Sequence, residues 1–294
     1  MSIPWHADAV PSSPDLEPLP LPDDHAWASI GVLCGPEIHA GHQSRIFGAD
    51  VRGERCVVKL TDGRLVDESF RRRVEVVASL AETNTTVVGP VPIGSNVVTA
   101  LGDWLIVAYP TVVGRVPDVT RPRDVERMAS TLAGLHDSLS QLGAVGLPPV
   151  AALRGPDSGN VFPDFGRSQL LHGDYSDSNL LLAGDRVRVL DFDDCGYGPV
   201  EFDVGNTLYM VLFDSWMSDD LPRFERFRGL FVDGYRSASG QAVTAAALEY
   251  AIRLRVDALG RWIDHPEESP IGIRTATPAW RDSLRAFVES RPMG

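Results

Sequence analysis

The stretch LHGDYSDSN at Leu171–Asn179, followed by VLDFD at Val189–Asp193, decides the fold of this 294-residue chain. It places a carboxylate at Asp174, a side-chain amide five residues later at Asn179, and a second carboxylate, Asp191, at the end of an apolar strand. Phosphoryl transfer needs a group that orients the attacking hydroxyl and hard oxygen ligands that hold Mg²⁺ on the phosphates. Asp174 suits the first role, and the other two residues suit the second.

The order and spacing of these residues resemble the aminoglycoside phosphotransferase and choline kinase superfamily, which shares the protein-kinase-like fold. The resemblance implies an α+β, bilobal chain with a small β-rich N-lobe and a larger, mainly helical C-lobe. It implies that Asp174 is the catalytic base or hydroxyl-positioning residue and that Asn179 and Asp191 are the Mg²⁺ ligands. His172 and Asp203 are expected to be structural and to brace the catalytic loop.

The small lobe of such a kinase needs a lysine for the α- and β-phosphates, held by a carboxylate on a helix. The chain has 27 Lys and Arg residues, and Lys59, within an apolar strand, is the one lysine among them. Retention of a single lysine in mid-strand indicates a specific need for an ammonium group. We expect Glu75 to be its ion-pair partner, with Glu68 as the alternative.

Two further segments are candidates for binding the nucleotide. The segment His39–Ser44 lies where a phosphate-covering loop should precede the strand pair, and it carries Gly41 and the hydroxyl of Ser44. An ordinary turn is an equally good interpretation of this segment. The segment around Tyr109 and Thr111 resembles the hinge of the family, where backbone groups bind the adenine edge. The expected cofactor is Mg²⁺ with ATP, and GTP is possible.

Composition divides the chain into three parts. Residues 1–25 carry six prolines and no Lys or Arg, which predicts an extended or mobile arm. Residues 26–110 form the predicted nucleotide-binding lobe, and 111–294 the catalytic and substrate-binding lobe. Expected strands are 44–51, 54–60, 97–99, 104–109, 169–171, 179–182 and 186–190; expected helices are 67–82, 124–139, 224–237 and 244–263.

The charge, hydropathy and cysteine pattern exclude several classes of protein. A net charge of −13 disfavours nucleic-acid binding. No apolar run is long enough to span a bilayer, and the first residues lack the pattern of a secretory signal. The 3 cysteines are widely spaced, which argues against a disulfide framework or a zinc site. We therefore expect a cytoplasmic protein with no nucleic-acid or membrane partner, either a monomer or a homodimer.

A small acceptor is favoured over a protein, because only eleven residues lie between Asp191 and Asp203, and the segment that docks peptides in protein kinases has no room. A cationic acceptor needs carboxylate partners, since an unpaired buried ammonium is costly. The candidates for this role are Asp194, Glu201 and Asp214. The leading hypothesis is phosphorylation of a cationic antibiotic, either an aminoglycoside or a tuberactinomycin-type peptide such as viomycin or capreomycin, giving resistance.

Two alternatives remain open. One is a metabolic kinase acting on a hydroxylated amine or amino acid, such as a choline- or homoserine-like acceptor. An aromatic cage would favour choline, and Trp216, Tyr209 and Trp262 are the candidates for it. The other is a nucleotide-binding pseudokinase without activity. The retention of the lysine and of all three catalytic-loop polar residues argues against it.

Overall fold

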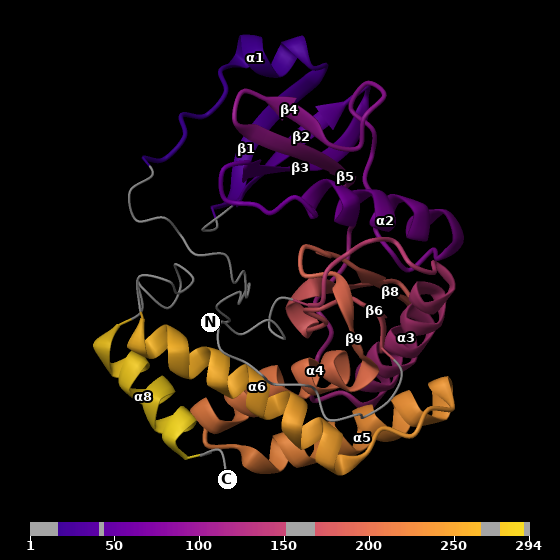
Figure 1. Cartoon of the computed structure of the whole chain (residues 1–294), viewed down its shortest axis with the longest axis vertical. Helices are drawn as coiled ribbons and strands as arrows, with labels where there is room; N and C mark the ends of the chain where they lie inside the picture. The colour runs from indigo at the N-terminus through magenta and orange to yellow at the C-terminus, as the bar shows by residue number, and fades with distance from the viewer. Residues whose placement is uncertain (1–16, 41–43, 151–167, 266–276, 291–294) are drawn as a thin grey trace. The chain divides into compact units, whose positions relative to one another are not determined.

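The computed structural model describes residues 17–40, 44–150, 168–265 and 277–290. These residues fall into two compact units, a small unit that ends at Val113 and a large unit that begins at Gly114. The architecture is mixed, with an antiparallel sheet in the small unit and mainly helices in the large one (Figure 1). The predicted α+β class with a β-rich N-terminal part and a helical C-terminal part is confirmed.

The small unit is built on a five-stranded antiparallel sheet in the order β1-β2-β3-β5-β4. The strands are β1 (Val32–Ala40), β2 (Ser44–Val51), β3 (Glu54–Asp62), β4 (Thr99–Leu101) and β5 (Trp104–Pro110). A two-residue turn joins β2 to β3, with Arg52 at φ 56° and Gly53 at φ 86°. Two consecutive positive φ angles match the right-handed twist of a hairpin, and the predicted turn at this position is confirmed.

The two faces of this sheet are covered by different helices. On one face Trp27 of α1 (Asp24–Ser29) packs with Phe47, Val58 and Ile106 of the strands. On the other, Phe70 and Val74 of α2 (Phe70–Thr83) pack on Val107. The alternation of side chains along each strand lets both faces be buried, and Val58 and Ile106 are fully so.

Part of the predicted N-terminal arm belongs to the small unit. Leu19 packs against the cluster around Trp27, and the carbonyl of Pro20 accepts a hydrogen bond of 2.9 Å from the indole of Trp104. Helix α1 begins at Asp24, where the side chain of Asp23 caps it. Residues 17–23 have no helix or strand, but Leu19 and Pro20 attach this part of the predicted arm to the small unit. Residues 1–16 lie outside the described part.

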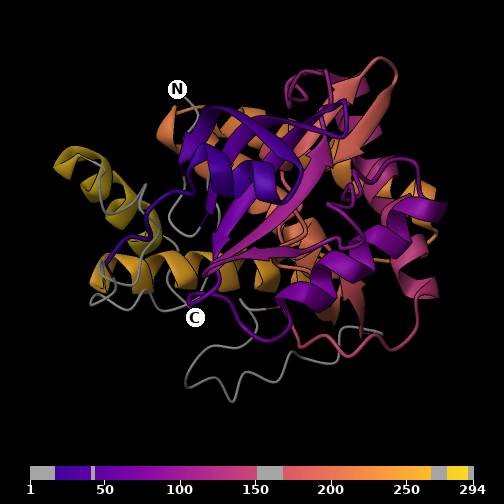
Figure 2. The ribbon, with the colours of Figure 1, turned by 90° about the horizontal axis from the view of Figure 1, so that it is seen from above.

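Helices dominate the large unit. They are α3 (Pro122–Gln141), α4 (Val200–Met217), α5 (Leu221–Ser239), α6 (Ala245–Asp264) and α8 (Pro278–Glu289). Helix α4 is buried on nearly every side and packs against both α5 and α6. Such all-round burial explains why its apolar residues are spread around the helix rather than gathered on one stripe. Helix α8 lies beside the end of α6 in both views (Figures 1 and 2).

Two small two-stranded sheets complete the large unit: β6 (Ser168–Leu171) with β9 (Gly196–Pro199), and β7 (Leu180–Ala183) with β8 (Arg186–Val189). The chain between β6 and β7 includes a short 3₁₀ turn, η2 (Asp177–Asn179). Of these short elements, the sequence predicted β6, β7 and β8 to within a few residues. It did not predict β9 or η2. No helix of the described residues has the length and apolarity needed to cross a membrane.

Candidate active site

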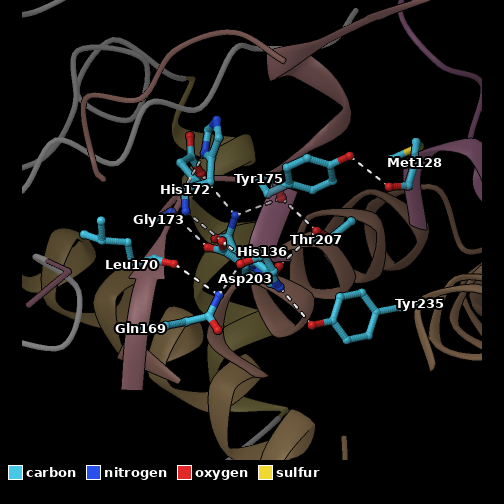
Figure 3. Close-up of polar contacts among 12 residues, drawn as sticks. Met128, His136, Gln169, Leu170, His172, Gly173, Tyr175, Asp203, Thr207 and Tyr235 are labelled. Atoms are coloured by element: carbon cyan, nitrogen blue, oxygen red, sulfur yellow. Dashed lines mark hydrogen bonds and ion pairs between the residues drawn. The ribbon is translucent and has the colours of Figure 1, made fainter. Parts of the chain in front are cut away.

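The loop between β6 and β7 is held from below by one buried carboxylate, Asp203 in the first turn of α4. Its Oδ2 accepts from the backbone N–H of His172 at 2.8 Å, and its Oδ1 accepts from that of Gly173 at 2.9 Å. The ring of His136, from α3, donates to the same carboxylate at 3.0 Å (Figure 3). Asp203 is fully buried, so these contacts fix the loop in a single position.

This set of contacts keeps Asp203 ionised. Burial alone would raise its pKa, but the hydrogen bond from His136 and the peptide N–H of Gly173 outweigh burial, so the pKa is lowered. The other ring nitrogen of His136 contacts the hydroxyl of Tyr235 at 2.8 Å. Because an ionised Asp203 accepts only, His136 donates to it through Nε2. The predicted structural role of Asp203 is confirmed.

His172 ties the loop to the end of the next hairpin. Its Nδ1 accepts from the backbone N–H of Asp174 at 3.2 Å, so Nε2 carries the proton and donates to the carbonyl of Leu190 at 2.9 Å. The ring is fully buried and lies 4.4 Å from the ring of Phe192, measured between centroids. His172 therefore braces the loop from both sides, as predicted.

The residue between His172 and Asp174 has to be glycine. Gly173 has φ +88°, a conformation that side chains rarely adopt. A Cβ at this position would also overlap the backbone carbonyl of Asp194. The absence of a side chain thus lets the segment after Asp191 approach the loop closely.

The carboxylate of Asp174 lies at the centre of the polar contacts. Its Oδ2 accepts from the side-chain amide of Asn179 at 3.0 Å, and that amide also donates to the backbone carbonyl of Asp174 at 2.9 Å. Its Oδ1 accepts from the amide of Asn206 on α4 at 3.2 Å. Nη2 of Arg255, on α6, lies 3.7 Å from the same Oδ1. The structure therefore brings Asp174 and Asn179 together. It adds Asn206 and Arg255, which the sequence did not predict.

The predicted metal ligands come from neighbouring positions. The backbone N–H of Leu190 donates to the carbonyl of Asn179 at 2.9 Å, which places Asp191 next along the chain from that contact. Asp191 itself has φ 56°, a strained conformation for a residue with a side chain. Since Asn179 uses its amide nitrogen toward Asp174, its amide oxygen is directed elsewhere. One amide oxygen and one carboxylate are the hard donors that Mg²⁺ prefers, so these residues fit the ion.

In the small unit, three of the predicted nucleotide-binding residues share one face of the sheet. Lys59 pairs with Ile46 on β2 and with Val107 on β5. Because paired residues point to the same side and alternate ones return to it, Ser44 and Tyr109 lie on the face of Lys59. This is the face that α2 covers. Gly41 lies outside the described residues.

Thr111 lies just beyond the end of β5. Its backbone N–H donates to the carbonyl of Arg55 at 3.1 Å, and its side chain is exposed. The hinge prediction concerns backbone groups, and of these the N–H of Thr111 already donates within the small unit.

The predicted pairing of Glu75 with Lys59 is not what the structure shows. The Glu75 carboxylate lies 3.2 Å from Arg72 on the same helix, and its side chain is 55% exposed. Helix α2 presents Phe70, Val74 and Val77 to the interior, and Glu75 follows one residue after that face. Glu68, the alternative, is also exposed and precedes the helix. The register of α2 turns Glu75 outward, and Glu68 lies outside the helix.

The three predicted acceptor-binding carboxylates differ in their surroundings. Asp214, on α4, has a side chain that is 55% exposed and lies 4.0 Å from Arg223. Glu201 is only 4% exposed, and burial raises its pKa. A carboxylate that binds a cation needs to be accessible to it, so the burial of Glu201 speaks against this role. Asp194 is half-buried, in the segment that approaches Gly173.

Comparison with known proteins agrees with this geometry. Residues 161–245, which include the loop and α4, match the model of the phosphotransferase enzyme family. The fold is similar to that of the amicoumacin kinase hAmiN, with a TM-score of 0.69 at 15% identity over 89% of this chain and 87% of that one. Part of the large unit thus resembles that family in sequence, and the chain as a whole has a fold similar to that of small-molecule kinases.

Two further solved structures resemble this chain in fold. A microcompartment-associated aminopropanol kinase has a TM-score of 0.63 at 18% identity, covering 88% of this chain and 90% of that one. The aminoglycoside phosphotransferase APH(4)-Ia, solved with ADP and hygromycin B, has a TM-score of 0.57 at 14% identity over 92% and 99%. A search of curated protein sequences finds no match.

Asn206 and Arg255 are the residues of the candidate site that the sequence did not predict, although each left a signal in it. Asn206 follows Asp203 by one helical turn, which puts both side chains on the face of α4 that meets the loop. Arg255 continues the apolar stripe of α6 formed by Leu248, Ile252 and Leu259. A charged residue in mid-stripe is expensive unless it has a partner inside the protein, so its position indicates one.

Proposed function

We propose that this phosphotransferase transfers the γ-phosphoryl group of ATP to a hydroxyl of a small, amine-bearing molecule. An antibiotic is the leading acceptor, and its modification would give resistance in the cytoplasm, where ATP is available. The observation that carries this proposal is the carboxylate of Asp174, which is held by the amides of Asn179 and Asn206 on a loop fixed by Asp203. A carboxylate fixed by amide donors can orient a hydroxyl and accept its proton.

The chemistry at Asp174 is simple. The acceptor hydroxyl would donate its hydrogen bond to a carboxylate oxygen, and its own oxygen would attack the γ-phosphorus. The new bond joins the acceptor oxygen to phosphorus, the bond from phosphorus to the β-phosphate oxygen breaks, and the hydroxyl proton passes to Asp174. ADP leaves. Mg²⁺ held by Asn179 and Asp191 would neutralise phosphate charge.

In this proposal the small unit supplies the nucleotide contacts. Lys59 would offer its ammonium group to the phosphates, and Ser44 lies on the same face of the sheet. The backbone of Tyr109 and Thr111 would meet the base. ATP is the expected nucleotide, with GTP as the alternative, and the expected state is a monomer or a homodimer.

A choline-type acceptor is less well supported. Tyr209 faces the guanidinium of Arg255, with 5.8 Å from Cζ to the ring centroid, and Trp216 packs edge-on against Phe287 at 5.4 Å. Two of the three candidate rings thus serve contacts within the chain. The structural resemblances include both antibiotic kinases and an aminopropanol kinase, so a metabolic hydroxylated amine or amino acid stays the second candidate.

The test is ADP release from Mg-ATP and Mg-GTP in a coupled assay. The acceptor panel comprises aminoglycosides, viomycin, capreomycin, macrolides, choline and homoserine. Asp174→Asn should lower turnover by about 10²- to 10⁴-fold, the usual contribution of a positioned base, while nucleotide binding is kept. Asp233→Asn, on the exposed side of α5, is the matched control and should change nothing.

Three results would contradict the proposal. Turnover that survives Asp174→Asn would mean that this carboxylate is not the hydroxyl-directing group. Loss of activity together with loss of folding would mean that the residue is structural. Nucleotide binding without turnover of any acceptor would favour a pseudokinase.

A further inference from the structure

Arg255 is a cation buried next to the proposed base, Asp174. It lies on the interior stripe of α6 and is 6% exposed. Its guanidinium has two contacts: Nη2 is 3.7 Å from Oδ1 of Asp174, and Cζ is 5.8 Å from the ring centroid of Tyr209. Burial of a cation is costly unless its hydrogen bonds are satisfied, so a buried guanidinium is expected to have acceptors for its N–H groups.

Its hydrogen-bonding capacity is not used within the described residues. A guanidinium has five N–H donors, and 3.7 Å is too long for a hydrogen bond. Within the described ranges, the guanidinium of Arg255 makes one ion pair, with Asp174, and one cation–π contact, with Tyr209. Oδ1 of Asn206, whose amide nitrogen binds Asp174, is also buried and has no hydrogen-bond partner there. Unused donors and an unused acceptor therefore lie beside one oxygen of the proposed base.

The charge of Arg255 restricts what can bind there. Like charges a few ångströms apart repel each other more strongly inside a protein than in water. An acceptor whose ammonium group lies next to the reactive hydroxyl would therefore be repelled by Arg255. A carboxylate or carbonyl oxygen at the same place would instead receive its hydrogen bonds.

A cationic part of the acceptor would have a different partner. Burial raises the pKa of the Tyr209 hydroxyl, and the charges of Arg255, Asp174 and Asp214 all act on it. Tyr209 is thus within electrostatic range of one cation and two carboxylates. Asp214 is half exposed, which leaves it open to an amine farther from the reacting hydroxyl.

We propose that Arg255 binds the acceptor and determines its class: a hydroxylated amine that also carries a carboxylate or carbonyl oxygen close to the phosphorylated hydroxyl. Arg255 donates hydrogen bonds to that oxygen, and Asn206 accepts from the acceptor beside it. This inference rests on the proposed function. It divides the candidate acceptors, because homoserine has a carboxylate, and viomycin and capreomycin have peptide carbonyls, close to their hydroxyls. Choline has neither group, and aminoglycoside hydroxyls lie on amino-sugar rings.

The first measurement is kcat/KM of the full-length wild type for homoserine and for 3-amino-1-propanol, which differ only by the carboxylate, together with the antibiotic panel. Acceptors with the carbonyl or carboxylate oxygen should be preferred. Arg255→Met should then raise their KM by about 10- to 100-fold, because a hydrogen bond to a charged group is lost, while the KM for ATP stays the same. Arg255→Lys should recover part of the loss. Arg261→Met, an exposed arginine on the same helix, is the control and should match the wild type.

The outcomes separate this inference from the proposed function. Turnover confined to aminoglycosides, choline or 3-amino-1-propanol would overturn the inference and leave the function standing. The same holds if Arg255→Met lowers kcat equally for every acceptor with KM unchanged, since the arginine would then only hold Asp174. If no acceptor is phosphorylated, both fail. The wild-type preference decides the matter even if Arg255→Met does not fold.

Discussion

The candidate residues of the large unit are joined in one buried hydrogen-bond network, whereas those of the small unit follow one face of a sheet. Asp174, Asn179 and Asp203 are buried and connected by hydrogen bonds of 2.8–3.0 Å through the loop backbone. Lys59 and Ser44 share a face because of the strand register, and Glu75 is turned toward the solvent. The groups proposed for the chemical step are therefore preorganised.

The difference has a physical reason. A group that orients a hydroxyl has to be held to a fraction of an ångström, and buried networks provide this at the cost of tolerance to change. Groups that bind phosphates tolerate more variation, because charge attraction falls off slowly with distance. Substitutions in the large unit should accordingly have larger effects than matched ones in the small unit.

The largest effect is expected at two glycines with nearly the same backbone angle. Gly173 has φ +88° and no space for a Cβ, while Gly53 has φ +86° and no atom within 4 Å of one. Gly53→Ala should cost about 1–2 kcal/mol, the strain of the left-handed conformation alone. Gly173→Ala should cost more than about 4 kcal/mol or leave an inactive loop. Denaturant unfolding and turnover measure both, and equal effects would contradict the contrast.

A smaller effect is expected from Asp203→Asn. The variant keeps the size of the side chain but removes the charge that accepts from His136 and the loop. It should lower the free energy of unfolding of the large unit by about 3 kcal/mol, the cost of removing one partner from a buried charged network. Urea unfolding monitored by tryptophan fluorescence measures this.

The pH dependence provides the control for Asp203→Asn. The folded pKa of Asp203 is lowered, so its contribution is fully present above the unfolded value, about 3.9, and is lost as pH falls through the folded value. The difference between wild type and variant should be constant from about pH 5 to 7 and should shrink below about pH 4. A difference that grows toward acid would mean that the carboxylate is not held ionised.

An intermediate effect is expected from Lys59→Met, which removes the one lysine of the chain. The KM for ATP should rise about tenfold or more, since an ammonium bound to phosphate contributes at least 1.4 kcal/mol. Lys59→Arg should keep part of the affinity. ATP titration with and without acceptor gives both values, and an unchanged KM would remove Lys59 from the nucleotide site.

The smallest effect is expected from Glu75→Gln. The carboxylate pairs with Arg72 on the surface of α2, and such pairs contribute about 0.2–0.5 kcal/mol. Stability should change by no more than that, and the affinity for ATP by less than twofold. A tenfold loss of ATP affinity would instead restore Glu75 as the partner of Lys59.

Sequence alone was sufficient where function depends on residues close together in the chain. Asp174, Asn179 and Asp191 are linked by one loop and one hairpin, so their spacing predicts their proximity. The turn at Arg52 and Gly53 was also predictable, because the strands on both sides are clear and only the turn remains to be assigned.

The features that the sequence did not predict depend on how helices rotate and on which elements pack together. Glu75 was misassigned because one residue of helical register, about 100°, separates a buried face from an exposed one. Arg255 reaches Asp174 only because α4 packs on α6, and no local pattern specifies that contact. Strand β9 was missed because its sequence, Gly196–Pro199, lacks the residues typical of strands and pairs with β6 across the fold.

The single lysine has one more consequence, for proteolysis. It sits in β3, the middle strand of the five-stranded sheet, with hydrogen-bonded neighbours on both sides. A protease that cuts only after lysine has one peptide bond to attack in the whole chain, and it can reach that bond only when β3 detaches. The rate at which fragments 1–59 and 60–294 are released therefore reports the opening of the small unit alone. Added nucleotide should slow the cut in proportion to its binding.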